Sequence, residues 1–190
     1  EDKQDLQVLD QRVLPFKAEW LSLSTEVDYY QAISDMVVRG APLIGVTAAY
    51  GYAFHLKNTL LNESTDSPIT TSKLINIMSE LQDYLGRSRP TAINLHWALN
   101  LMHQNLLELL QQGDEQGMIN DALFLSPAFQ QSVIQSLFAR AHLVRDNDVE
   151  CCRQIGLHGL KLIQGIYNNK KSTVRILTHC NAGALACVSW

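Results

Sequence analysis

The first part of the chain alternates between apolar and polar residues in two short stretches. The stretch LQVLDQRVLPF alternates until it meets Pro15, which predicts a short strand or hairpin arm that ends at the proline. The stretch EWLSLS alternates again, with Trp20, Leu21 and Leu23 as its apolar residues. Together the two stretches predict a small β-hairpin near the N-terminus.

Apolar residues then recur at helical spacing. Thr25 is expected to cap a helix in EVDYYQAISDMVV, and Gly40 is expected to end it. Pro42 lies one position inside the next expected helix, PLIGVTAAYGYAFHL, where its missing N–H costs nothing. Glycines and alanines give this second helix small side chains, so another element is expected to pack close to its backbone. The polar stretch 58–72 is expected to form a loop.

Four further helices are expected in the rest of the chain. One covers about residues 73–85, and another opens at Pro90. Ser126 and Pro127 are typical of the cap and first position of a helix that runs through Arg145. The fourth lies in DNDVECCRQIGLHGLKLIQGIY, whose glycines are expected to mark close helix packing.

The stretch TVRILTH is apolar and β-branched enough for a buried parallel strand. It leads into Cys180, a turn of Asn181 to Gly183, and small residues that predict the first turns of a helix. A lone buried strand needs neighbours on both edges. The fold class is therefore predicted as α/β overall. A mainly helical domain with short strands (1–127) precedes linker helices and the first strand–turn–helix of an incomplete α/β domain (128–190).

Composition and charge narrow the range of functions that the chain could have. The chain of 190 residues is 46% apolar and has a net charge of -4 without long charged runs, which argues against a nucleic-acid partner. No apolar run approaches the roughly 20 residues that span a membrane. No secretory signal is expected within the sequence, which begins at Glu1 rather than at Met. The cysteines at 151, 152, 180 and 187 show neither CxxC spacing nor a disulfide framework. They are read as reduced thiols of a cytoplasmic protein without a metal site.

Two arginines stand before prolines at expected helix starts. In VVRGAP, Arg39 and Gly40 place a guanidinium beside free backbone N–H groups and the positive end of a helix dipole, which suits a phosphate or carboxylate. In RPTA, Arg89 repeats the arrangement, and two such starts favour a shared anion. The alternative is an ordinary helix connection with a glycine cap and solvated arginines.

Cys180 would lie at the carboxyl end of the expected strand, where the following helix dipole favours its thiolate. Adjacent residues of a strand face opposite sides, so His179 is not expected to act as its base. The alternative is a buried apolar cysteine in a turn of small residues. His96 and His103 are read as structural or surface residues.

Taken together, five stretches resemble the methylthioribose-1-phosphate isomerase family. They are LDQRVLP, DMVVRGAPLIGVTAAYG, RPTAINLHWAL, RQIGLHGLKLI and ILTHCNAGALA, and they span nearly the whole chain in order. The same fold serves ribose-1,5-bisphosphate isomerases and the regulatory subunits of the exchange factor for eukaryotic initiation factor two. Both remain alternatives, the first as a close phosphosugar isomerase and the second as a regulatory or assembly module.

The resemblance implies an aldose–ketose isomerase that needs no metal or organic cofactor, acts on a phosphorylated sugar and forms a homodimer at full length. It implies that Arg39, Gly40, Ala41 and Arg89 hold the substrate and that Cys180 takes part in catalysis. It also implies a Rossmann-like second domain, whose later part carries the aspartate that partners the cysteine. This chain alone is therefore expected to be inactive.

The substrate's methylthio group is expected in an apolar pocket near the N-terminal helices. Tyr50, Trp97 and Met36 are its candidate lining residues.

Overall fold

The computed structural model describes residues 5–62, 69–115 and 125–189 of the chain. Over these residues the protein is mostly helical, with one two-stranded antiparallel sheet formed by β1 (Leu6–Leu9) and β2 (Trp20–Leu23). The predicted hairpin is therefore confirmed, although β1 ends well before Pro15. The helices are α1 (Glu26–Ser34), α2 (Ala41–Leu61), α3 (Thr71–Gly86), α4 (Ile93–Glu115) and α5 (Pro127–Lys170).

The capping prediction for α1 is confirmed. The Asp28 amide donates to the Thr25 hydroxyl at 3.2 Å, and the Thr25 amide donates to the Asp28 carboxylate at 2.8 Å, which completes a reciprocal capping box. Gly40 does not end this helix, contrary to prediction. Met36 adopts a left-handed φ of 60°, so α1 stops at Ser34, and Gly40 instead precedes the first residue of α2.

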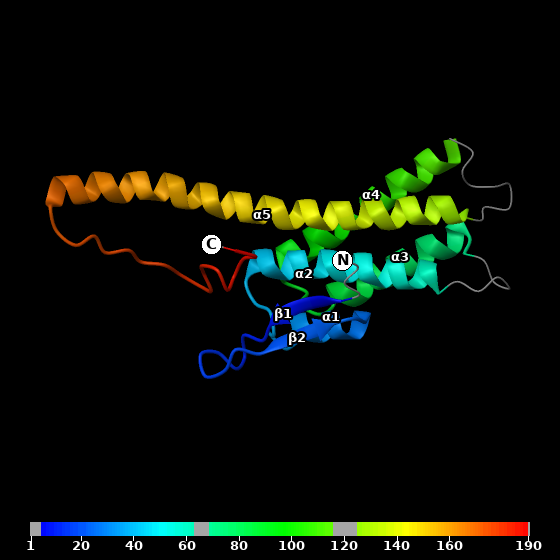
Figure 1. The fold of residues 1–190 in the computed structure, drawn as a ribbon, viewed down its shortest axis with the longest axis horizontal. Coiled ribbons are helices and arrows are strands. Elements are labelled where there is room, and N and C mark those ends of the chain that lie inside the picture. The colour runs from blue at the N-terminus through cyan, green and yellow to red at the C-terminus, as the bar shows by residue number, and fades with distance from the viewer. Residues whose placement is uncertain (1–4, 63–68, 116–124, 190) are drawn as a thin grey trace.

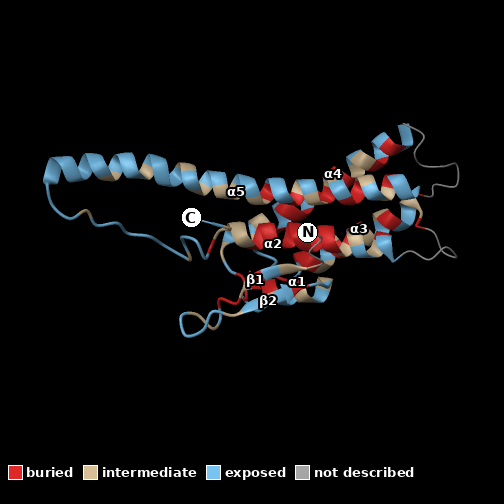
Figure 2. Ribbon diagram, in the orientation of Figure 1, coloured by how far each residue is buried: buried red, intermediate tan, exposed pale blue. Residues whose placement is uncertain are grey.

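Helix α2 lies at the centre of the molecule and is buried along most of its length (Figure 2). Its small residues allow close approach, as predicted. A Cβ atom added at Gly51 would lie 2.7 Å from the Tyr29 ring of α1. One added at Gly45 would lie 2.9 Å from the carbonyl oxygen of Asn94 in α4. The first turns of α2 and α4 are therefore in direct contact.

The helix predicted over 73–85 is confirmed as α3, which begins slightly earlier, at Thr71. The prediction that Pro90 opens α4 is wrong, because α4 begins at Ile93. The Ala92 amide donates to the Arg89 carbonyl at 2.9 Å, so a tight turn precedes the helical hydrogen-bond ladder. Of the predicted loop over 58–72, the first residues belong to α2, and 63–68 lie outside the described residues.

Helix α5 is continuous over 44 residues, where two helices were predicted. Its predicted start is confirmed, since the Phe129 amide donates to the Ser126 hydroxyl at 3.2 Å. No proline or glycine interrupts the sequence near Arg145, so nothing there ends the helix. The part up to Val144 packs on the core with α2 and α4, and the remainder projects beyond it (Figures 1 and 2).

Two predictions for the projecting part are wrong. Gly156 and Gly159 do not mark close packing, because a Cβ atom added at either would meet nothing within 4 Å. The following stretch TVRILTH forms no strand, and its Leu177 is 98% exposed. A parallel strand requires neighbouring strands, and none lies beside this stretch among the described residues.

After α5 the chain runs back along the helix to the N-terminal end of α2 (Figure 1). No helix in the described part of the chain is both long enough and apolar enough to cross a lipid bilayer.

We expect opposite effects from the same substitution at two glycines. In this chain, Gly51→Ala should lower the free energy of unfolding by about 1–3 kcal/mol, because the added methyl group overlaps the Tyr29 ring. The matched control, Gly156→Ala, should raise it by about 0.5–1 kcal/mol, because an exposed helical glycine gains helix propensity without a clash. Urea unfolding measures both. A destabilising Gly156→Ala would contradict the exposed position of this part of α5.

Candidate functional site

The stretch that contains Arg39, Gly40 and Ala41 forms the entry to α2. Gly40 has φ 117° and ψ 133°, a backbone conformation that residues with a side chain rarely adopt. Pro42 stands in the first turn of α2, as predicted. Arg39 and Ala41 are both exposed, so the guanidinium and the helix start face solvent at the same place.

The C-terminal segment, defined here as residues 181–188, docks on this entry. The Asn181 side chain donates to the Arg39 carbonyl at 3.0 Å, and the Leu43 amide donates to the Ala186 carbonyl at 3.2 Å. A Cβ atom at Gly40 would lie 2.3 Å from the Cα of Ala186, so only glycine allows this contact. The structure therefore brings VRGAP and NAGALA together, although they are far apart in sequence.

Two further hydrogen bonds hold the C-terminal segment. Gln11, a buried residue that follows β1, donates from its side chain to the Leu185 carbonyl at 2.7 Å. The Val188 amide donates to the Asp148 carboxylate of α5 at 2.9 Å. Contacts to three separate parts of the chain thus fix the segment in place.

Cys180 stands immediately before the C-terminal segment. It is exposed and adopts a left-handed φ of 64°. The predicted helix after it is absent; a short turn forms instead, in which the Ala186 amide donates to the Gly183 carbonyl at 2.9 Å. The reading of Cys180 as a buried apolar residue is therefore wrong, and its thiol is open to solvent beside the entry to α2.

Arg89 lies half-buried in the connection between α3 and α4. Within the described residues, no hydrogen bond joins its side chain to Arg39 or to the C-terminal segment. Its connection nevertheless leads into the first turn of α4, which contacts the first turns of α2 at Gly45. The two arginine-bearing turns therefore stand at neighbouring helix starts.

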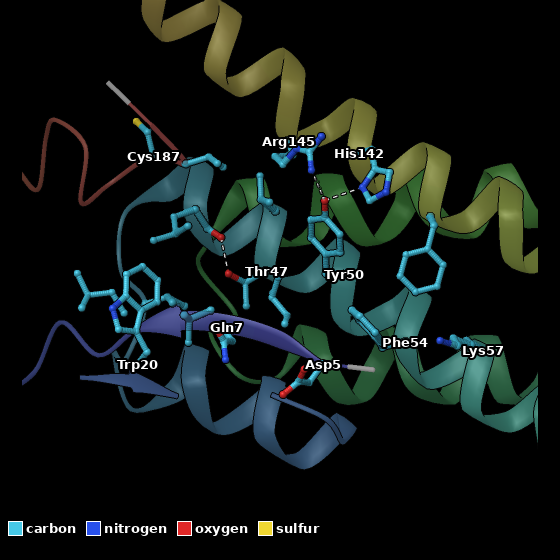
Figure 3. Close-up of a pocket in the computed structure, with 18 of the residues that line it drawn as sticks. Asp5, Gln7, Trp20, Thr47, Tyr50, Phe54, Lys57, His142, Arg145 and Cys187 are labelled. Atoms are coloured by element: carbon cyan, nitrogen blue, oxygen red, sulfur yellow. Dashed lines mark hydrogen bonds between the residues drawn. The ribbon is translucent and has the colours of Figure 1, made fainter. Parts of the chain in front are cut away.

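A cavity of about 950 Å³ opens between β1, α2, α5 and the C-terminal segment (Figure 3). Its wall includes the apolar residues Val38, Leu43, Val46, Phe54 and Phe138. Of the three predicted lining residues, Tyr50 lines this cavity, whereas the half-exposed Met36 and Trp97 do not.

Tyr50 is the centre of a polar group within that wall. Its hydroxyl lies 2.7 Å from Nδ1 of His142 and accepts a hydrogen bond from Arg145 at 3.3 Å (Figure 3). Burial raises the pKa of Tyr50, and Arg145 partly opposes this rise. Desolvation, together with the charge of Arg145, lowers the pKa of His142, which Asp146 partly opposes. Near pH 7 the arrangement is thus a neutral phenol hydrogen-bonded to a neutral imidazole, and the tautomer of His142 decides which of the two donates.

The sequence reasoning missed His142, Arg145 and Gln11. His142 and Arg145 are one helical turn apart on α5, next to the buried Ala141 and Val144. That spacing was visible in the sequence, but their partner Tyr50 lies on another helix. The structural reading of His96 and His103 agrees with their contacts, to the Pro90 carbonyl and the Tyr52 hydroxyl respectively.

The sequence pattern of the Initiation factor 2 subunit family matches residues 37–189. This match covers most of the chain and includes both sequences that meet at the entry to α2. The chain belongs to this family.

Curated relatives are named methylthioribose-1-phosphate isomerase. The protein from Cereibacter sphaeroides (strain KD131) is 39% identical over 186 residues, which are 98% of this chain and 42% of the relative. The protein from Caldicellulosiruptor saccharolyticus is 40% identical over 179 residues, which are 94% of this chain and 43% of the relative. The chain therefore spans less than half the length of these curated relatives.

Two solved structures share the fold. The 5-methylthioribose 1-phosphate isomerase from Pyrococcus horikoshii OT3 aligns with a TM-score of 0.70 and 28% identity, over 100% of this chain and 44% of that one. The translation initiation factor eIF-2B subunit delta from A. fulgidus aligns with a TM-score of 0.70 and 25% identity, over 99% and 46%. The resemblance stated from the sequence is thereby confirmed.

Replacement of Gly40 by alanine is expected to release the C-terminal segment from α2. The new methyl group would overlap Ala186, and the φ of 117° is strained for any residue with a side chain. This strain, about 1–3 kcal/mol, should accelerate hydrogen exchange at the Leu43 amide about tenfold. Ala41→Ser, at the adjacent exposed position, is the control and should leave that exchange unchanged. Equal protection in Gly40→Ala and the parent would contradict the docking.

Proposed function

We propose that the protein containing this chain converts 5-methylthioribose 1-phosphate to 5-methylthioribulose 1-phosphate. The observation that carries the proposal is the contact between the Arg39–Gly40 turn and the segment that follows Cys180. Relatives that are 39% and 40% identical over nearly all of this chain bear the isomerase name. The regulatory alternative is supported by the Initiation factor 2 subunit family pattern and by a structure that is 25% identical, a lower identity than that of the isomerase relatives.

We assign the phosphate of the substrate to the two arginine-bearing turns. Arg39 supplies a guanidinium, and Gly40 and Ala41 open α2, whose N-terminal end carries partial positive charge. Arg89 supplies a second cation from the neighbouring helix start. In the structure the Leu43 amide binds the Ala186 carbonyl, so the phosphate would rely on the exposed guanidinium and backbone groups nearer Gly40.

The reaction is an internal redistribution of atoms. The bond between C1 and the ring oxygen breaks and the oxygen gains a proton. A hydrogen moves from C2 to C1, and the 2-hydroxyl loses its proton as the ketone forms. Nothing is gained or lost overall, so a positioned acid–base pair suffices, and we propose that no metal or organic cofactor takes part.

Cys180 is the residue that we assign to the reacting carbons. Its exposed thiol stands beside the phosphate-binding turn, where it can move a proton or stabilise developing charge. Its acid partner is assigned to an aspartate in the part of the relatives that this chain does not span. A carboxyl group of tuned pKa is suited to protonating the ring oxygen.

The surroundings of the site belong to the same proposal. Residues 1–127 would form the helical domain, and residues 128–190 would open a Rossmann-like α/β domain that continues in the full-length protein. We propose a homodimer in the cytoplasm, where Cys180 stays reduced, and Tyr50 as the lining residue nearest the methylthio group. The sequence evidence for these points is the family resemblance.

The substrate assignment is tested by assaying the full-length protein with two sugars. We expect conversion of 5-methylthioribose 1-phosphate, followed by proton NMR at C1, and at least about tenfold lower kcat/KM with ribose 1,5-bisphosphate. Preference for the bisphosphate would favour the close phosphosugar isomerase. Turnover of neither sugar would favour the regulatory subunit and overturn the proposal.

The role of Cys180 is tested in the same protein. Cys180→Ala should lower kcat about 100-fold or more, because a positioned proton-transfer or stabilising group is lost. Cys151→Ala is a matched control, since Cys151 is an exposed free thiol on α5 to which the proposal assigns no role in the reaction. A loss of less than about tenfold in Cys180→Ala would remove the cysteine from the mechanism.

A further inference from the structure

A second group of reactive side chains lies where the C-terminal segment meets α5. Asp148 and Cys152 are one turn apart on α5 and therefore point in the same direction. Cys187 reaches the same place from the C-terminal segment. One ligand atom from each of these three half-buried residues lies within 4.8 Å of the other two. Cys187 also lines the cavity that contains Tyr50, and none of the three has a role in the proposed isomerisation steps.

The backbone holds this group in position. The Val188 amide donates to one carboxylate oxygen of Asp148 at 2.9 Å. The other oxygen faces Cys152, whose thiol lies 3.9 Å away. An outer hydrogen bond of this kind orients a ligating carboxylate in metal sites. Because the donor is the neighbour of Cys187 in sequence, the same bond also brings Cys187 to α5.

We propose that Asp148, Cys152 and Cys187 bind one Zn²⁺ ion, with water as the fourth ligand. Two thiolates and one carboxylate form a donor set for a tetrahedral, borderline-soft cation, whereas Mg²⁺ and Ca²⁺ require mainly oxygen ligands. Ligand atoms already within 4.8 Å of one another need only a small contraction to surround an ion with bonds of about 2.0–2.3 Å. The sequence did not indicate this site, because its third ligand lies far along the chain from the other two.

Zinc binding here is a proton exchange without a redox step. Burial, the hydrogen bond with Cys152 and the charge of Asp148 raise the pKa of Cys187 to about 12, so its thiol is protonated in the free protein. On binding, the Cys152 and Cys187 thiols each give a proton to solvent and form Zn–S bonds, and the Asp148 carboxylate contributes a Zn–O bond. Affinity should therefore rise with pH.

The bound ion would join the C-terminal segment to α5. The segment otherwise depends on a few hydrogen bonds and the contact of Ala186 with Gly40. Metal bonds would keep it seated and hold the adjacent Cys180 beside the entry to α2. This structural role does not depend on which reaction the protein catalyses, so the site can be tested without an activity assay.

The test measures zinc in the full-length protein, purified and kept reduced. Competition with a chromogenic chelator should give one Zn²⁺ per chain. Cys152→Ser and Cys187→Ser should each weaken binding at least about 100-fold, more than the loss of an outer hydrogen-bond partner costs. Cys151→Ser, the neighbouring exposed cysteine, should change affinity less than about twofold. Added zinc should raise Tm in the parent and in Cys151→Ser, and not in Cys187→Ser.

Several results would overturn the proposal. They are a reduced protein that binds no zinc, equal binding in Cys152→Ser and the parent, and a loss of binding in Cys151→Ser alone. A disulfide between Cys152 and Cys187 in freshly isolated protein, seen as a mass lower by two hydrogens, would also assign the pair to redox chemistry. Asp148→Asn keeps an acceptor for the Val188 amide but loses the charge, so unchanged affinity in it would remove Asp148 from the site.

Discussion

Two glycines of α2 allow α1 and α4 to approach this helix more closely than any residue with a side chain would permit. At Gly51 the Tyr29 ring of α1 lies against the helix, and at Gly45 the carbonyl oxygen of Asn94 in α4 does so. Because α2 is buried along most of its length, the other helices are arranged around it. The contact at Gly45 sets α4 beside the first turns of α2. The turns that carry Arg39 and Arg89 therefore stand at adjacent helix starts, which the candidate site requires.

Local signals predicted much of this fold. The hairpin, the caps at Thr25 and Ser126, and Pro42 in the first turn of α2 all depend on residues within a few positions of one another. The failures arose where a distant contact, or its absence, decides the structure. TVRILTH has the composition of a buried strand, yet no strand lies beside it among the described residues, and the stretch stays exposed. The composition of a segment indicates that it can form a strand, but neighbouring strands decide whether it does.

The candidate site shows the same division. Arg39 and Gly40 were recognised because they precede Pro42 at an expected helix start, and Cys180 because it lies between an expected strand and the turn at Gly183. Their proximity required a hydrogen bond between Asn181 and the Arg39 carbonyl, across most of the chain, which no spacing rule predicts. Tyr50 with His142, and Asp148 with Cys187, likewise pair residues on different elements. Sequence thus identified the individual residues better than it identified their partners.

The length of α5 has a mechanical consequence. The part beyond Val144 extends for about 39 Å at the usual helical rise, without core packing along it. A tilt of about 5° in the packed part would move the far end by roughly 3 Å at that rise. The segment that returns from this end is anchored at the entry to α2. It therefore links the tip of α5 to the core and opposes such a tilt. Whatever loads the tip of α5 therefore pulls on the same few hydrogen bonds that seat the segment after Cys180.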